Sequence, residues 1–195
     1  MRIALGREAQ PSAGIIDSQS VKITGVGGRR GYDGGKQIKG RQRHLLVDSQ
    51  GLLLKVKVHP ADVMNRDGVE LLLPPAQTRE QFPRLAHVWL DAAYNGKDQG
   101  QHWIEQQLGW TAQIVQQPPK PRGVWAPAGA VIDWATLLPP PGFHLLPRRW
   151  VVERTLAWLG HSRRLSKEYE RLCESSEAIV YAAMARLMVC RLARI

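Results

Sequence analysis

A β-hairpin and a strand–helix–strand crossover follow one another in this sequence, and one sheet can contain both only if its strands run in mixed directions. The apolar runs at 44–48 and 52–59 are separated by a short polar turn, which is typical of an antiparallel hairpin. Strand-like runs at 87–91 and 111–115 flank a helical pattern at 98–108. Because a helical crossover favours parallel pairing, we expect an α/β fold with a mixed sheet.

The other segments complete a five-stranded sheet flanked by helices. We expect a strand at 14–18, a helix at 62–73 capped by Asp67, a proline-rich connector at 118–142 with at most a short helix near 131–137, and helices at 148–160 and from about 175. In the last helix, helical spacing predicts a buried stripe formed by Val180, Ala183, Met184 and Leu187.

The charge balance favours a polyanionic partner. The 195 residues include 27 Lys and Arg against 17 Asp and Glu, a net charge of +10, so nucleic acid is the expected partner. No apolar window is long enough for a membrane span, and the first ten residues do not resemble a signal peptide. Since Cys173 and Cys190 are the only cysteines, we expect a cytoplasmic protein without a disulfide framework and without membrane association.

Basic residues gather in two regions that we expect to contact DNA phosphates. The stretch 18–43 is rich in glycine and suggests a flexible loop; its alternative interpretation is a solvated loop without a ligand. Its candidate contacts are Arg29, Arg30, Lys36, Lys39, Arg41 and Arg43. The second region begins in the helix at 148–160, with candidates Arg149, Arg154, Arg163, Arg164 and Lys167.

Two aspartates end short apolar strands, and a glutamate on a later helix could join them. If the strands ending at Asp17 and Asp91 are parallel neighbours, their carboxylates lie side by side, and a hard cation such as Mg²⁺ or Mn²⁺ would relieve the repulsion. Glu153 is the candidate third ligand, four residues after Arg149. The alternatives are a turn or cap role for each aspartate, as expected for Asp48 in the hairpin turn, and a surface ion pair for Glu153.

Several strings carry a resemblance to a known family. They are Asp17-Ser18-Gln19-Ser20-Val21-Lys22, Gly31-Tyr32-Asp33-Gly34-Gly35-Lys36, Lys39-Gly40-Arg41-Gln42-Arg43-His44-Leu45-Leu46-Val47-Asp48, His59-Pro60-Ala61-Asp62 and Arg148-Arg149-Trp150-Val151-Val152-Glu153-Arg154-Thr155. The sequence resembles the DDE transposases of bacterial insertion sequences, in particular the insertion-sequence-five-like group. The resemblance implies an RNase H-like catalytic domain over 17–195, after a short N-terminal remnant at 1–16. Leu146 and Gly160 depart from the family pattern, which often has Tyr and Lys there.

The resemblance also implies a chemistry. Asp17, Asp91 and Glu153 match the catalytic acids that hold two Mg²⁺ (or Mn²⁺) ions for DNA strand cleavage and strand transfer at insertion-sequence ends, and Arg149 would contact the scissile phosphate or orient Glu153. The implied partner is double-stranded DNA, both the terminal inverted repeats and the target. A homo-oligomer on DNA, and an upstream reading frame that supplies the N-terminal recognition region, are also implied.

Two other functions remain open from the sequence: a catalytically inactive DNA-binding remnant, and an RNase H-like nuclease that does not transpose. Trp150 and Trp158 fit either core packing or stacking on a displaced base. The six histidines lack the spacing of a transition-metal site, so we expect them to be structural.

Overall fold

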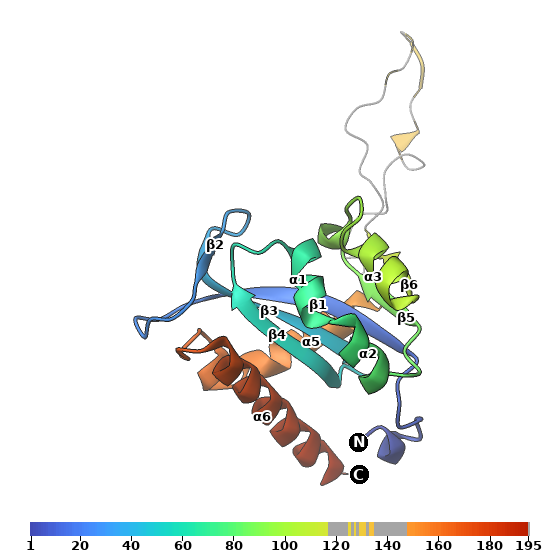
Figure 1. Ribbon diagram of the computed structural model, residues 1–195. Helices are drawn as coiled ribbons and strands as arrows, with labels where there is room; N and C mark the ends of the chain where they lie inside the picture. The colour runs from blue at the N-terminus through green and yellow to red at the C-terminus, as the bar shows by residue number, and fades with distance from the viewer. Residues whose placement is uncertain (117–124, 126, 128, 132, 135–147, 195) are drawn as a thin grey trace.

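The protein forms a mixed sheet with helices on both faces, which agrees with the expected RNase H-like α/β fold (Figure 1). The computed structural model describes residues 1–116, 125, 127, 129–131, 133–134 and 148–194. The strands are β1 (Ala13–Lys22), β2 (Gly31–Asp33), β3 (Ile38–Asp48), β4 (Leu53–Pro60), β5 (His87–Leu90) and β6 (Thr111–Ile114). All five expected strands are therefore present, and β2 is an additional one.

The strand β1 lies in the middle of the sheet. It pairs antiparallel with β3 on one side and parallel with β5 on the other, and β5 pairs parallel with β6. The outer edge of β3 is shared by β2 and β4, which pair with successive parts of it. The hairpin and the parallel crossover thus occupy the two halves of one sheet, as the sequence predicts.

Side chains alternate across the sheet into two hydrophobic cores. Ile16 and Leu46 belong to the core beneath α1 (Asn65–Leu72), α2 (Pro75–Gln81) and α3 (Gln101–Leu108). Their sequence neighbours Ile15, Leu45 and Val47 belong to the core beneath α5 (Arg149–Gly160) and α6 (Cys173–Leu192). Figure 1 shows α1 and α2 on one side of the sheet and α6 on the other.

The helices agree with the sequence in most respects. The helix α3 ends before Gly109, whose φ of 69° requires the left-handed conformation that glycine adopts easily. In α6, Val180 and Met184 are buried as expected, with Ala183 and Leu187 partly buried beside them.

Other details differ from the expectation. Met64, and not Asp67, occupies the N-cap position of α1, and Asp67 lies in its first turn. The helix α2 was not expected, because its polar sequence lacks an apolar period and only Pro75 at its start indicates it. Most of the expected connector, and most of its short helix, fall outside the described residues. Among the described helices, none combines the length and apolar character that a membrane crossing requires.

The expectation of a flexible loop at 18–43 is wrong, because most of this stretch belongs to the sheet. The strand β1 continues to Lys22, β3 starts at Ile38, and β2 pairs with β3 between them. Gly40 permits this pairing: a Cβ atom there would lie 1.9 Å from the Val21 carbonyl oxygen. At Gly40, the glycine therefore allows two strands to approach closely, so glycine in this stretch does not indicate flexibility alone.

Two arginines of that stretch are inside the protein. Arg41 is 0% exposed and Arg43 2% exposed, and both face Glu168, which is 1% exposed. The Glu168 carboxylate lies 3.5 Å from Arg41 Nη1 and 3.2 Å from Arg43 Nη2, and it accepts a hydrogen bond from Ser176 Oγ at 2.8 Å. Arg43 also donates to the Leu165 carbonyl at 2.8 Å, and Arg41 to the Glu170 carbonyl at 2.9 Å. These contacts fasten the segment between α5 and α6 to the sheet.

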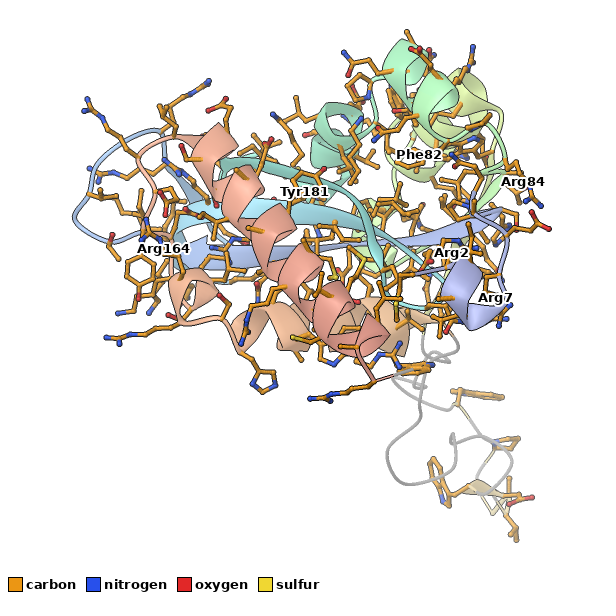
Figure 2. The ribbon with its side chains drawn as sticks, turned by 90° about the horizontal axis from the view of Figure 1, so that it is seen from below. Arg2, Arg7, Phe82, Arg84, Arg164 and Tyr181 are labelled. Carbon is orange, nitrogen blue, oxygen red and sulfur yellow. The ribbon has the colours of Figure 1, made fainter. Side chains whose placement is uncertain are left out.

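Other polar contacts hold the turn of the β3–β4 hairpin and the outer edge of β4. In the turn, Asp48 accepts hydrogen bonds from the amides of Gln50 and Leu52 at 2.8 and 2.9 Å, which confirms its expected turn role, and it pairs with Arg2. Along the outer edge of β4, the amides of Val56 and Val58 donate to the Tyr181 hydroxyl and the Glu177 carboxylate of α6, at 3.1 and 2.9 Å. Tyr181 is labelled on α6 in Figure 2.

We expect Glu168→Gln to lower the free energy of unfolding by about 3–5 kcal/mol, because it leaves two buried guanidinium groups without an anion. Urea denaturation monitored by circular dichroism measures this. Glu170→Gln is the matched control: it removes the pair with the exposed Arg164, and we expect a loss below about 1 kcal/mol. Equal losses in the two variants would contradict a structural role for the buried cluster.

Candidate active site

Asp17 and Asp91 occupy the same level of two parallel neighbouring strands. Ile15 pairs with Trp89, and each aspartate follows its strand's paired residue by two positions. Because side chains alternate, both carboxylates point to the face that carries Ile15 and Trp89, which is the face beneath α5. The expectation that adjacent parallel strands bring these two residues to one edge therefore agrees with the strand register.

The helix α5 brings Glu153 and Arg149 to the same place. The Arg149 Nη2 atom lies 3.6 Å from Asp91 Oδ2 and 3.3 Å from Glu153 Oε1. Val152, next to Glu153, is fully buried in the core that α5 shares with the sheet, so the helix is held firmly against β1. The ion pair between Arg149 and Glu153, considered from the sequence as the alternative to a ligand role for Glu153, is present, and Arg149 also pairs with Asp91.

Asp17 is electrostatically coupled to this group. The pKa of Asp17 is raised from 3.8 to about 6, mainly by burial and to a smaller extent by the negative charges of Asp91 and Glu153. The Ser18 amide, which donates to Asp17 Oδ1 at 2.7 Å, and the Arg149 charge act in the opposite direction. Asp17 is thus within electrostatic range of Asp91, Glu153 and Arg149.

Asp91 has a local structural role as well. Its Oδ1 atom accepts a hydrogen bond from the Ala93 amide at 2.7 Å and so caps the short 3₁₀ helix Ala92–Tyr94. Its Oδ2 atom is the one that faces Arg149. The cap alternative considered from the sequence is therefore correct for Asp91, and it leaves one carboxylate oxygen directed at the site.

A polar network behind Asp17 was not expected from the sequence. The Ser18 hydroxyl donates to the Asn65 side-chain oxygen at 3.1 Å, and the Gln42 amide donates to the Ser18 hydroxyl at 3.0 Å and also to Asn65. These side chains come from β1, β3 and the first turn of α1, so no local pattern connects them. The network fixes Ser18, whose backbone amide holds the Asp17 carboxylate.

Two histidines near this network form a buried pair, which sequence spacing did not indicate because they lie 15 residues apart. His44 Nδ1 lies 2.7 Å from His59 Nε2, and His59 Nδ1 lies 2.8 Å from the Pro60 carbonyl. Burial is the main cause that lowers the pKa of both rings, so both are neutral at pH 7. Gly68 packs directly on them, since a Cβ atom there would lie 2.3 Å from His44 Cε1. The pair fills the core beneath α1, which supports the expected structural role.

The remaining expected DNA contacts differ in exposure. The exposed ones are Arg29, Arg30, Lys36 and Lys39 around β2, and Arg163, Arg164 and Lys167 after α5. Arg154 is half-buried, with its guanidinium 4.4 Å from the Trp150 ring centroid and 4.5 Å from that of Trp158. Trp150 is 36% exposed, and neither it nor Trp158 is part of the two hydrophobic cores, so the core packing considered from the sequence is wrong for Trp150; both rings contact the Arg154 guanidinium. Arg41 and Arg43 are buried and cannot reach DNA without unfolding this part of the sheet.

The site has the donor chemistry of a divalent-cation site. Carboxylate oxygens are the ligands that Mg²⁺ and Mn²⁺ prefer, and the mutual repulsion that helps to raise the pKa of Asp17 is what such an ion relieves. Among the described residues, no three acidic, histidine or cysteine side chains are already grouped as a complete ligand set. Arg149 supplies the positive charge between Asp91 and Glu153. We conclude that the residues fit a hard divalent ion in type.

Comparison with known proteins gives one family. The family described as the transposase DDE domain matches residues 8–188, a range that includes all three acidic residues of the site. No curated protein matches the chain.

We expect the stability of the metal-free protein to fall as the pH rises from about 4 to about 6, because the folded state binds the Asp17 proton more tightly than the unfolded state does. Asp17→Asn should remove this fall and raise the free energy of unfolding at pH 7.5 by about 1–3 kcal/mol. Urea denaturation in EDTA at several pH values measures both effects. The exposed Asp62→Asn is the control and should keep the wild-type pH dependence; an Asp17 variant that also keeps it would contradict the assignment.

Proposed function

The chain belongs to the transposase DDE domain family, and from this we propose that it cleaves DNA strands at insertion-sequence ends and transfers them to target DNA. The observation that carries the proposal is the group formed by Asp17, Asp91, Glu153 and Arg149, in which parallel strands and a buried helix face bring acidic side chains to one edge of the sheet. Membership of the insertion-sequence-five-like group is part of the proposal.

In this proposal Asp17, Asp91 and Glu153 hold Mg²⁺ or Mn²⁺. When bound, the metal supplies activation of the attacking hydroxyl and stabilisation of the leaving oxygen. The protein contributes the fixed position of the ligands. Ser18 holds Asp17 through its amide, and the 3₁₀ helix holds Asp91. Hydrolysis and strand transfer then differ only in the nucleophile, which is water in the first and a DNA 3′-hydroxyl in the second.

Arg149 has two states in this proposal. In the free protein it neutralises Asp91 and Glu153, which would otherwise repel each other. With DNA bound, its guanidinium contacts the scissile phosphate or orients Glu153, because a planar fork of donors matches either anion. The half-buried position of Arg149 leaves it accessible to both partners.

We propose that the exposed cations guide the double-stranded DNA of the terminal repeats and of the target to this site. They lie around β2 and after α5, and they neutralise phosphates without reading sequence. We leave Arg41 and Arg43 out of this surface, because Glu168 already neutralises them inside the protein. Joining two transposon ends to one target requires two sites, so a homo-oligomer on DNA is part of the same proposal.

We expect Asp91→Asn to abolish strand cleavage of a duplex that carries the cognate terminal repeats in Mg²⁺, while DNA binding persists. The substitution keeps the size of the side chain but removes one ligand charge. Gel-based cleavage and strand-transfer assays, with a parallel binding assay, measure this. Asp62→Asn, an exposed carboxylate with the same charge change, should cleave at the wild-type rate.

Three outcomes would redirect this proposal. Wild-type rates in the Asp91 variant would refute the metal role of that residue. DNA binding without cleavage by the wild-type protein would favour the inactive remnant, and cleavage without joining would favour the nuclease.

A further inference from the structure

A second basic site lies away from the carboxylates, between the end of α5 and the C-terminal half of α6. It is a cavity of about 430 Å³ whose lining includes Trp158 of α5, His161 just after that helix, and Arg186, Arg191 and Arg194 of α6 and its end. None of the described residues that line it is acidic. Figure 2 shows α6 crossing the same face of the sheet as α5.

The arginines of this cavity lack the anionic partners that other cations of the protein have. Lys57 pairs with Glu177 at 3.0 Å and Arg164 with Glu170 at 2.8 Å. Within 1–116 and 148–194, by contrast, neither Arg186 nor Arg194 makes an ion pair or a side-chain hydrogen bond. Like charges gathered without an anion repel one another, so the cavity is suited to a ligand that carries several negative charges.

The aromatic side chains continue the basic surface along α5. The Arg191 guanidinium lies 3.7 Å from the centroid of Trp158, and Arg154 lies 4.5 Å from the same ring and 4.4 Å from Trp150. Stacking on a ring holds a guanidinium in place and leaves its N–H edges available to an anion. The cavity and this row of stacked groups therefore form one continuous set of positioned donors.

This surface is distinct from the catalytic group. Trp158 follows Glu153 by five positions, which in an α-helix turns the side chain by about 140° around the axis. At the helical rise, His161 lies about 12 Å from Glu153 along the same axis. A ligand seated on Trp158 and Arg186 thus approaches α5 from a different side than one held by Glu153.

We propose that this cavity binds the phosphate backbone of duplex DNA outside the catalytic site. The proposal rests on the proposed function, because it takes DNA as the ligand of the protein. Arg186, Arg191 and Arg194 neutralise phosphates, and the stacked Arg154 extends the contact along α5. None of these contacts reads a base, so the site adds affinity for any sequence.

The test is the salt dependence of DNA binding. Affinity for a labelled duplex of about 30 base pairs of arbitrary sequence is measured by fluorescence anisotropy in EDTA over a series of KCl concentrations. Each phosphate contact contributes about 0.9 to the slope of log affinity against log salt, so Arg186→Ala combined with Arg194→Ala should reduce the slope by about 1.8. Both side chains are exposed, so the fold should be unaffected.

The matched control is Arg79→Ala combined with Arg84→Ala. It changes the net charge equally, but Arg79 lies in α2 and Arg84 follows that helix closely, and Figure 1 shows α2 on the other face of the sheet from α6. An unchanged control slope with a reduced slope in the cavity variant supports the proposal. Equal slopes in the wild type and the cavity variant, or equal reductions in both variants, would overturn it and leave the proposed function standing. A wild-type protein that binds no DNA would overturn the proposed function itself.

Discussion

The pairing of β1 on both of its edges determines where every polar group of the site points. Ile15 and Ile16 anchor the strand in the two cores, and the alternation then directs Asp17 toward α5 and Ser18 toward α1. A shift of the register by one residue would exchange these two faces, and Asp17 would be directed into the core with the histidine pair. The hydrophobic packing of β1 is therefore what holds a carboxylate in a position that its own burial makes unfavourable.

The protein has two charge clusters of opposite arrangement. Glu168 is an anion between two buried arginines, whereas Arg149 is a cation between two acidic side chains of the site. The first cluster is enclosed and complete, which suits a structural connection. The second is half-exposed, and within the part of the chain that the structure describes Asp17 makes no ion pair of its own, although the Arg149 charge acts on it. A net charge of +10 therefore overstates the cations that are available to a ligand.

The sequence predicts those parts of the fold that short-range periodicity encodes. The hairpin, the crossover, α5 and α6 follow from apolar spacing, and the juxtaposition of Asp17 and Asp91 follows from parallel strand ends. Glu153 was a candidate third acid from its position on the helix, and the family resemblance added support for it. Composition failed for Arg41 and Arg43, because a cationic stretch does not reveal which side chains face inward or that their partner lies some 125 residues away. The network of Ser18, Gln42 and Asn65 joins three separate elements, so no local pattern could indicate it.

The side chains of α6 that bond to β4 have a consequence for how copies of this protein can meet. An outer strand with free amides is a template onto which a strand of another molecule can add. Here Tyr181 and Glu177 already accept from Val56 and Val58, so this part of the edge is closed to sheet extension. Self-association must then use side-chain surfaces instead of backbone pairing at this edge. Loss of α6 would expose the amides of Val56 and Val58 on β4, and strands of other copies could then add to this edge and cause aggregation.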